Sequence, residues 1–402
     1  MNKEKFPRVP YGSTVHGEDE INAVVEVLRS STQMGEKVNL FEERISELFV
    51  KDFGLMTNSG SSALYLAMES LDLEEGSEII TPALTFATTV ASQVKNKLVP
   101  AFVDVKVDSY CIDETLIEGS ISKRTKAILA PDLLGNLCNW KEIKRLADKY
   151  NLLVLHDSAD TLGATLNEEY PGKYTDLSIT SFYGSHIINA AGNGGMLCTS
   201  DKDVFRKAKL LRSWGRASSI FKDSESIEDR FKVNLEGIQY DAKFGFDELG
   251  YQLEPSEISA AFGLIQLDKL EENLESRKKF FELHNKFFSN YSDFFILPKE
   301  TPGARTGWLA YPLIVKDGVG FSRTELQIFL EKRNIQTRVI FTGNILRQPG
   351  FKDIQCVGRA QDFKNSDLVM RGGILLACHH GLDDNLLDHV HSSIKLFMKG
   401  KT

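Results

Sequence analysis

An α/β fold with a mostly parallel sheet, followed by a smaller α+β domain, is predicted for this chain of 402 residues. Short apolar runs alternate with helical stretches between residues 55 and 183, which is typical of strand–helix units in a parallel sheet. Beyond Pro298 the pattern changes to strand-like apolar runs mixed with helices. We therefore expect a large domain over residues 1–255 and a small C-terminal domain over residues 256–402.

The spacing of apolar residues predicts the individual elements. Residues 17–51 carry apolar side chains at helical intervals and predict two amphipathic helices. A long helical pattern covers 256–288. The expected strands of the large domain are 79–80, 99–105, 127–130, 152–156 and 179–183, with helices at 62–71 and 140–150 between them. In the small domain, strand-like runs cover 308–315 and 336–341.

Composition and charge exclude several classes of protein. The 48 Lys and Arg residues against 56 Asp and Glu give a net charge of −8, so no general attraction for nucleic acid or an anionic membrane is expected. The N-terminal residues have no signal-peptide pattern, and no run is apolar enough to span a membrane. The five cysteines are well separated, so we expect a reducing, cytoplasmic setting without disulfides.

Three segments could carry chemistry. Asn58-Ser59-Gly60-Ser61-Ser62 precedes a helix, where backbone N–H groups form a phosphate site or the small hydroxyl residues simply cap the helix. An apolar strand ends at Asp157, and ligand sites in open α/β sheets lie at such ends, although Asp157 is equally able to cap the next helix. The third segment runs from Ser181 through His186 to Gly194-Gly195.

Together these segments resemble the sugar aminotransferase family of fold-type I enzymes that depend on pyridoxal phosphate (PLP). The resemblance covers nearly the whole chain and implies a homodimer with each active site at the subunit interface. The residues that carry it are Ser59-Gly60-Ser61-Ser62-Ala63, Pro82-Ala83-Leu84-Thr85-Phe86, Phe102-Val103-Asp104-Val105, Asp157-Ser158-Ala159-Asp160, Ser181-Phe182-Tyr183 through Gly194-Gly195, Gly250-Tyr251-Gln252 and 260–267.

The resemblance implies which residues hold the phosphate and the ring of the cofactor. Gly60, Ser61 and Ser181 would bind the cofactor phosphate. Phe86 would stack on the pyridine ring, because an aromatic face buries apolar area without blocking chemistry. Each also has a plain structural interpretation: Phe86 as a core residue and Ser181 as a hydroxyl at a strand end.

Three further positions follow from the same resemblance, and two arginines are candidates on chemical grounds. Asp157 would pair with the ring nitrogen, which keeps the ring an electron sink, and Asp160 would lie near the cofactor hydroxyl. Gln252 stands where family members carry an Asn that reaches the neighbouring subunit's cofactor phosphate. Arg216 and Arg338 are candidates for binding the nucleotide diphosphate or the carboxylate of glutamate, because arginine suits bidentate anion recognition.

The main departure from the family is at His186. Most members have a lysine five residues after the Ser181-type serine, and its amine forms a Schiff base with PLP. An imidazole cannot do so, and the sequence has no lysine between Lys173 and Lys202. We therefore expect the cofactor to bind non-covalently, cycling through pyridoxamine phosphate (PMP), with His186 as general acid and base. Counting back from the glycines would instead place Ile187 at the lysine position, but Ile187 has no chemistry.

This substitution resembles two groups of relatives, the GDP-4-keto-6-deoxymannose 3-dehydratases and the CDP-4-keto-6-deoxyglucose 3-dehydrases. The resemblance implies removal of the C3 hydroxyl of a nucleotide-diphospho-4-keto-6-deoxyhexose in deoxysugar biosynthesis, including lipopolysaccharide O-antigen, with glutamate as amino donor. The CDP-sugar enzymes carry an iron–sulfur cluster, whose cysteines are replaced here around Ser158 and at 217–219. We therefore expect neither that cluster nor a reductase partner.

Two other functions are compatible with the same residues. The alternatives are a lysine-free sugar nucleotide aminotransferase and a non-catalytic PLP-binding scaffold. Cys378-His379-His380 could suggest a metal, but adjacent His side chains diverge on a regular element and no ligand pair at suitable spacing accompanies them. We expect no metal site there, and interpret the motif as a strand end near the active site or a plain structural segment.

Overall fold

A seven-stranded sheet forms the centre of the molecule. In the computed structural model, which describes residues 5–221, 223 and 225–401, its strand order is β1-β8-β7-β5-β4-β2-β3. β8 is antiparallel to both neighbours, and the strands from β7 to β3 are parallel, as predicted. The strands are β1 (Phe53–Thr57), β2 (Glu78–Pro82), β3 (Val99–Val103), β4 (Thr125–Pro131), β5 (Leu153–Asp157), β7 (Leu177–Ser181) and β8 (Gly195–Thr199).

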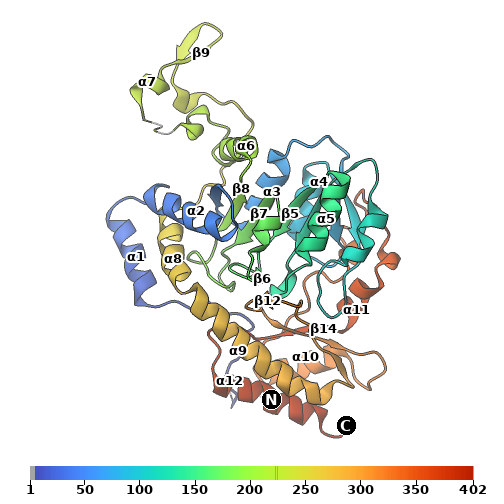
Figure 1. The fold of residues 1–402 in the computed structure, drawn as a ribbon. Coiled ribbons are helices and arrows are strands. Elements are labelled where there is room, and N and C mark those ends of the chain that lie inside the picture. The colour runs from blue at the N-terminus through green and yellow to red at the C-terminus, as the bar shows by residue number, and fades with distance from the viewer. Residues whose placement is uncertain (1–4, 222, 224, 402) are drawn as a thin grey trace.

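Helices cover both faces of this sheet (Figure 1). Successive strand residues point to opposite faces, so Ile79 packs with α3 and α6, whereas Ile80 packs with α5. The two helices predicted within residues 17–51 are present as α1 and α2. The helices around the sheet are α1 (Glu18–Arg29), α2 (Glu36–Leu48), α3 (Gly60–Ser70), α4 (Ala87–Lys95), α5 (Trp140–Tyr150) and α6 (Lys202–Arg212).

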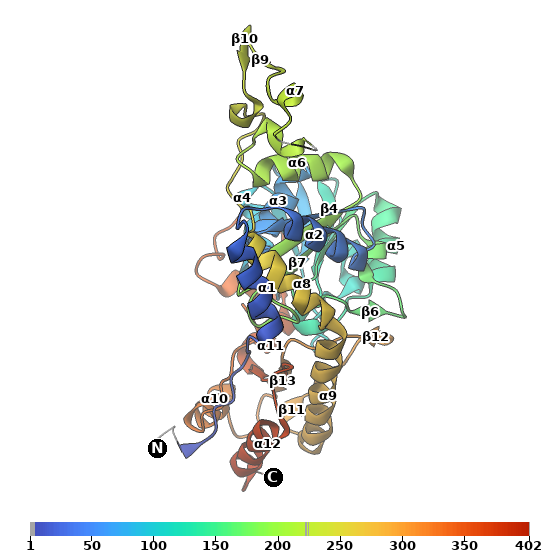
Figure 2. The same cartoon turned by 90° about the vertical axis from the view of Figure 1, so that its left-hand side faces the viewer.

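The long helical pattern predicted over 256–288 is interrupted at Lys269. α8 (Glu257–Asp268) packs against α1 and α2, and α9 (Leu270–Phe288) continues into the C-terminal part of the molecule (Figure 2). Lys269 leaves helical geometry with a ψ of 5°, and its Nζ lies 2.7 Å from Oε1 of the buried Glu20. This ion pair ties the break between the two helices to the first turn of α1.

The C-terminal part is an antiparallel sheet with helices around it. β11 (Phe295–Ile296), β13 (Tyr311–Val315) and β14 (Gly373–Leu376) form the sheet in the order β11-β13-β14. The strand prediction for 336–341 was wrong, because only Arg338 pairs there, as a single bridge to Leu375, and the chain turns at Phe341 with a φ of +42°. The helices that cover this sheet are α10 (Arg323–Lys332), α11 (Lys364–Gly372) and α12 (Asp384–Met398). The division at residue 255 stays a prediction.

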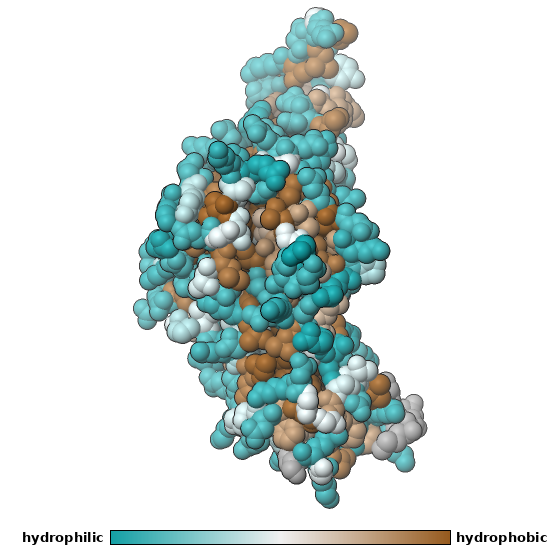
Figure 3. Space-filling model, turned by 90° about the vertical axis from the view of Figure 1, so that its right-hand side faces the viewer, coloured by the Kyte–Doolittle hydropathy of each residue, from teal (hydrophilic) through white to brown (hydrophobic). Residues whose placement is uncertain are grey.

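Between α6 and α8 the chain forms an arm that projects from the body in Figures 1 and 2. It contains α7 (Ile227–Arg230) and the hairpin of β9 (Val233–Leu235) and β10 (Ile238–Tyr240). Its apolar side chains are exposed, with Leu249 94% accessible, and Figure 3 shows apolar residues gathered on it at the top of the view. Within the described residues, no helix combines the length and apolar run that crossing a membrane requires.

Candidate active site

A cavity of about 380 Å³ lies where the carboxyl ends of the parallel strands face the C-terminal part. β5 and β7 are adjacent in the sheet, so their last residues, Asp157 and Ser181, both line it. Phe341 and Leu309 reach it from the C-terminal part, and Tyr11 from the N-terminal segment.

One end of the cavity is formed by the first turn of α3. Ser59 is the N-cap, and its Oγ accepts a hydrogen bond of 3.1 Å from the Ser62 amide. A Cβ at Gly60 would lie 2.7 Å from Cβ of Ser181, and a Cβ at Gly195 would lie 2.4 Å from the Gly60 nitrogen. Glycine at both positions therefore lets the positive end of α3 approach the ends of β7 and β8 closely. Such a helix terminus suits an anion.

The wall beside this helix terminus comes from β2 and α4. Ser61 Oγ donates a hydrogen bond of 3.2 Å to Thr88 Oγ1, which joins the first turns of α3 and α4. Phe86 is the N-cap residue of α4, and its side chain is 52% exposed within the cavity lining. Its ring meets that of Phe341 edge-on at 5.9 Å. The cavity therefore has an aromatic wall.

Two buried carboxylates also line the cavity. Asp157 Oδ2 accepts a hydrogen bond of 2.8 Å from Thr89 Oγ1, and its Oδ1 accepts one of 3.2 Å from the Ala159 amide. Asp160 Oδ2 accepts one of 2.9 Å from the Leu134 amide. Burial raises the pKa of Asp157 despite its hydrogen bonds. Burial, with a contribution from the charge of Asp157, raises the pKa of Asp160 to about 7.

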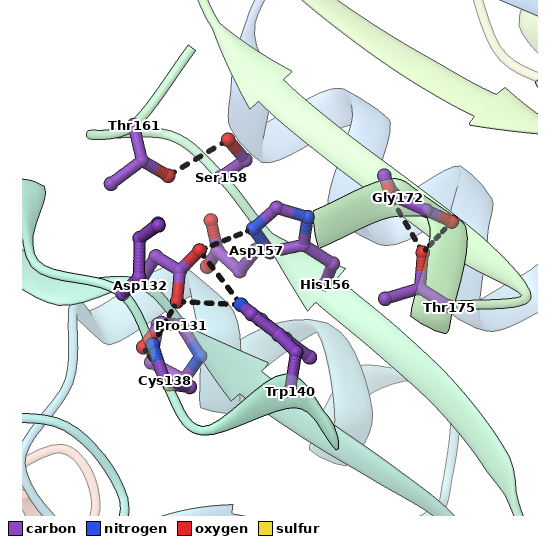
Figure 4. Close-up of polar contacts among 12 residues, drawn as sticks. Pro131, Asp132, Cys138, Trp140, His156, Asp157, Ser158, Thr161, Gly172 and Thr175 are labelled. Carbon is purple, nitrogen blue, oxygen red and sulfur yellow. Dashed lines mark hydrogen bonds and ion pairs between the residues drawn. The ribbon is translucent and has the colours of Figure 1, made fainter. Parts of the chain in front are cut away.

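Behind Asp157 lies a buried polar network. Figure 4 shows His156, Trp140 and Cys138 converging on Asp132. His156 Nε2 lies 2.8 Å from Asp132 Oδ2, Trp140 Nε1 donates to both carboxylate oxygens at 3.1 Å, and the Cys138 amide donates at 2.7 Å. The Asp132 amide in turn donates to the Asp157 carbonyl at 3.0 Å. The network therefore fixes the strand end that carries Asp157.

His186 stands in the loop after β7, half-buried in the cavity lining. Its Nδ1 lies 3.3 Å from the Ser181 carbonyl oxygen, so Nδ1 carries the proton and Nε2 is the basic nitrogen of the neutral ring. Desolvation lowers the pKa of His186 to about 4. Hydrogen bonds to the backbone of Ser181 and Ala159 act in the opposite direction, and the positive charge of Arg277 contributes to the lowering. Ile187, the alternative lysine position, is 1% exposed and belongs to the core around α2 and α8.

The match to known proteins covers residues 15–395, which fit the DegT/DnrJ/EryC1/StrS aminotransferase family. The chain belongs to this family. It is 34% identical to the lipopolysaccharide biosynthesis protein RfbH of Salmonella typhimurium LT2, over 97% of this chain and 91% of that protein. It is 32% identical to the dTDP-4-dehydro-2,6-dideoxy-D-glucose 3-dehydratase of Saccharopolyspora spinosa, over 98% and 87% of the two chains.

The fold is likewise that of a solved family member. The structure of the E. coli GDP-4-keto-6-deoxy-D-mannose-3-dehydratase with bound hydrated PLP matches at a TM-score of 0.86 and 26% identity, over 96% of this chain and 99% of that one. The family and the fold class expected from the sequence are thereby confirmed. The relatives in this PLP-dependent family are sugar-modifying enzymes, some of them named 3-dehydratases and others aminotransferases.

The structure brings most of the predicted site residues together. The cavity is lined by Gly60, Ser61, Phe86, Asp157, Asp160, Ser181 and His186. The other predicted residues, Arg216, Gln252 and Arg338, do not line it. Arg216 stacks on Trp214 within the base of the arm, with 4.7 Å from Cζ to the ring centre, and Gln252 is exposed beside it, bridging to Ser213. Their roles stay predictions.

Arg338 lies next to the cavity but outside its lining. Its guanidinium carbon stands 5.5 Å from the centre of the Tyr11 ring, and Tyr11 does line the cavity. Sequence reasoning missed Tyr11 and Arg277, because no local pattern marks residues whose hydrogen-bond partners lie between 31 and 325 positions away. Cys378-His379-His380 begins two residues after the end of β14, and His380 accepts a hydrogen bond from Arg277, so the motif lies just beyond a strand end. Within the described residues, no group of His, Cys, Asp and Glu could hold a metal ion.

Proposed function

We propose that this protein is a PLP- and PMP-dependent sugar nucleotide 3-dehydratase, a lyase that removes the C3 hydroxyl of a nucleotide-diphospho-4-keto-6-deoxyhexose. The observation that carries the proposal is His186, which lines the cavity at the position where most family members have lysine. The named activities of the Saccharopolyspora and E. coli relatives support it. Glutamate is the amino donor, and the working enzyme is a cytoplasmic homodimer.

The cavity residues fit the cofactor. Asp157 is buried and has no ion-pair partner within the described residues, so a protonated ring nitrogen would supply its missing counter-charge. Thr85 Oγ1 in the lining is buried without a hydrogen-bond partner, and a bound cofactor would supply one. Gly60, Ser61 and Ser181 would hold the phosphate at the start of α3, with Phe86 against the ring and Asp160 near the ring hydroxyl.

The bound cofactor, as PMP, supplies an amine that condenses with a keto sugar and an electron sink for the bond changes that follow. His186 provides proton transfer. Its Nε2 is unprotonated in the neutral ring, so it accepts a proton, and the resulting imidazolium can donate that proton to the departing C3 hydroxyl. Asp157 holds the charge on the ring nitrogen. No covalent bond to the protein is needed, because the site has no amine to form one.

The exposed arm supports the homodimer. Ile227, Ile238, Phe244 and Leu249 expose more than half of their surface, an apolar area that a second subunit would cover. Gln252, at the base of this arm, is exposed and would reach toward the partner's cofactor phosphate. We expect no iron–sulfur cluster and no reductase partner.

The test is the mass of the sugar product. The protein is incubated with PLP, glutamate and a 4-keto-6-deoxy sugar nucleotide, and the nucleotide sugar is analysed by mass spectrometry. We expect a product lighter by one oxygen atom and free of added nitrogen. An amino sugar would instead support the sugar nucleotide aminotransferase, and no conversion of any GDP-, CDP- or dTDP-linked substrate would support a PLP-binding scaffold.

A further inference from the structure

Arg277 is a buried cation surrounded by neutral hydrogen-bond acceptors. Its side chain, on α9, is 0% exposed. It forms no ion pair with a carboxylate within the described residues, unlike Arg212, which is also buried but bonds to Glu42 at 2.7 Å. A buried charge without a counter-ion is costly unless every donor is satisfied.

All of the guanidinium N–H groups of Arg277 are used, and together they join three segments. Nη2 donates to the carbonyl oxygens of Ser185 at 3.1 Å and His186 at 3.0 Å. Nη1 donates to those of Trp308 at 3.2 Å and Leu309 at 3.1 Å, and Nε donates to His380 Nδ1 at 3.1 Å. Five donors in a rigid fork are the full capacity of arginine, which lysine cannot reproduce.

Two of these segments contribute to the cavity wall. The loop with His186 and the segment with Leu309 both line the cavity, and hydrogen bonds from the Arg277 guanidinium to both hold them together. The N-terminal segment packs on the same loop, because a Cβ at Gly12 would lie 2.7 Å from Cβ of Ser185. The backbone of His186 is therefore fixed from α9, while its ring is oriented by the Ser181 carbonyl.

We propose that Arg277 is a positioning residue that fixes the backbone of His186 and, with its positive charge, further disfavours protonation of the His186 imidazole. A permanent positive charge beside a histidine disfavours a second one. Arg277 accordingly contributes to the lowered pKa of His186, and also to those of His379 and His380. This inference rests on the proposed function only for the catalytic meaning of His186.

The other titratable groups around this arginine act in the opposite direction or are neutral at physiological pH. Asp160, Tyr11 and Cys378 each favour the charged form of Arg277, and burial lowers its pKa to about 10, so it keeps its charge near neutral pH. The Tyr183 ring meets the His186 ring edge-on at 6.0 Å. Arg277 is thus the cation that acts on His186.

The test measures proton binding at His186 in the full-length, cofactor-free protein. Histidine ¹³Cε1 resonances are followed by NMR against pH, with the His186 signal assigned by its loss in His186→Asn. The variants are Arg277→Met, which removes the charge, and Arg277→Lys, which keeps the charge but loses the fork. The matched control is Arg212→Met, a buried arginine on α6 outside the cavity lining.

We expect His186 to stay neutral in the wild type and in Arg212→Met between about pH 8 and about pH 5.5. In Arg277→Met its midpoint should rise above that of the wild type, because the positive charge beside the ring is gone while the burial of the ring remains. In Arg277→Lys the midpoint should stay low, while kcat falls at least about tenfold with little change in KM, because a misplaced catalytic group affects the reaction more than binding.

Identical titration of His186 in all four proteins would overturn the inference. Circular dichroism shows whether Arg277→Met is folded. If it is not, Arg277→Gln, which keeps N–H donors but has no charge, replaces it in the same NMR titration. A raised midpoint with no dehydration in the wild type would support the role of Arg277 and contradict the proposed function. The NMR titration therefore tests the role of Arg277, and the assay for dehydration separately tests the proposed function.

Discussion

The hydroxyl of Thr89 donates a hydrogen bond of 2.8 Å to Oδ2 of Asp157. The bond orients a buried carboxylate that lacks a cation within the described residues, at the point where β5 ends in the cavity. This hydrogen bond does not neutralise Asp157, so the carboxylate would still be able to pair with a positively charged group of a ligand. The carboxylate of Asp157 and the imidazole of His186 both line the cavity.

Replacing Asp157 with Asn should weaken binding of PMP about ten- to a hundredfold. A hydrogen bond to a charged group contributes about 1.5–3 kcal/mol, and each 1.4 kcal/mol corresponds to a factor of about ten. The affinity is measured by absorbance titration of the cofactor-free protein. Thr89→Val is the control, because it removes one bond to Asp157 and keeps the charge, so its effect should be smaller. Equal affinities of Asp157→Asn and the wild type would contradict the assignment.

Replacing His186 with Lys should give the protein a covalent bond to PLP and abolish dehydration. The new amine would stand where most family members have theirs, and a lysine fixed to the cofactor cannot take over the proton transfers of the free imidazole. Borohydride reduction followed by intact-protein mass spectrometry detects the bond. His186→Asn should show neither the bond nor dehydration. Continued dehydration by His186→Lys would show that His186 is not the required base.

Much of this site could be predicted because it follows from local rules. Asp157 and Ser181 end consecutive parallel strands, and adjacent parallel strands place their carboxyl ends side by side. Gly60 follows an N-cap serine at the start of a helix, which marks an anion-binding terminus. Counting from Ser181 places His186 at the lysine position, which stays a prediction, and His186 lines the cavity while Ile187 is buried in the core.

The remainder depends on contacts between distant parts of the chain. Tyr11 enters the cavity because Val9 pairs with Ile335, a contact that no local pattern indicates. Residues 336–341 have strand-like composition, but only Arg338 finds a pairing partner, because the chain turns away at Phe341. Tertiary contacts here override local preference.

Replacing Asp160 with Asn should change how stability depends on pH. Asp160 has a pKa of about 7 in the folded protein, above its ordinary value of 3.8. Between those values the folded state holds more protons than the unfolded state, so its free energy of unfolding decreases as pH rises. The Asn variant cannot bind this proton, so its stability relative to the wild type should increase from about pH 4 to about pH 7.

Urea denaturation of the cofactor-free proteins at a series of pH values measures this difference. The control is Asp268→Asn, which removes an exposed ion pair with Arg44 and should leave the difference from the wild type nearly independent of pH over this range. A constant difference for Asp160→Asn would contradict the raised pKa.

Replacing Trp140 with Phe should lower the free energy of unfolding by about 1–3 kcal/mol beyond the loss of ring volume. The change removes the indole N–H that bonds both oxygens of Asp132, a carboxylate that is 1% exposed. Trp308→Phe is the matched control, because Trp308 is also fully buried but donates to the half-buried Glu300, which water can still reach. An equal or larger loss in Trp308→Phe would contradict the importance of the Asp132 network.

The ratio of ammonia to 2-oxoglutarate distinguishes a 3-dehydratase from an aminotransferase. In a 3-dehydratase the nitrogen taken from glutamate is released, so wild-type protein with PLP, glutamate and a converted sugar nucleotide should form the two products in equal amounts. In an aminotransferase the nitrogen stays on the sugar. Formation of 2-oxoglutarate and modified sugar without ammonia would contradict the account.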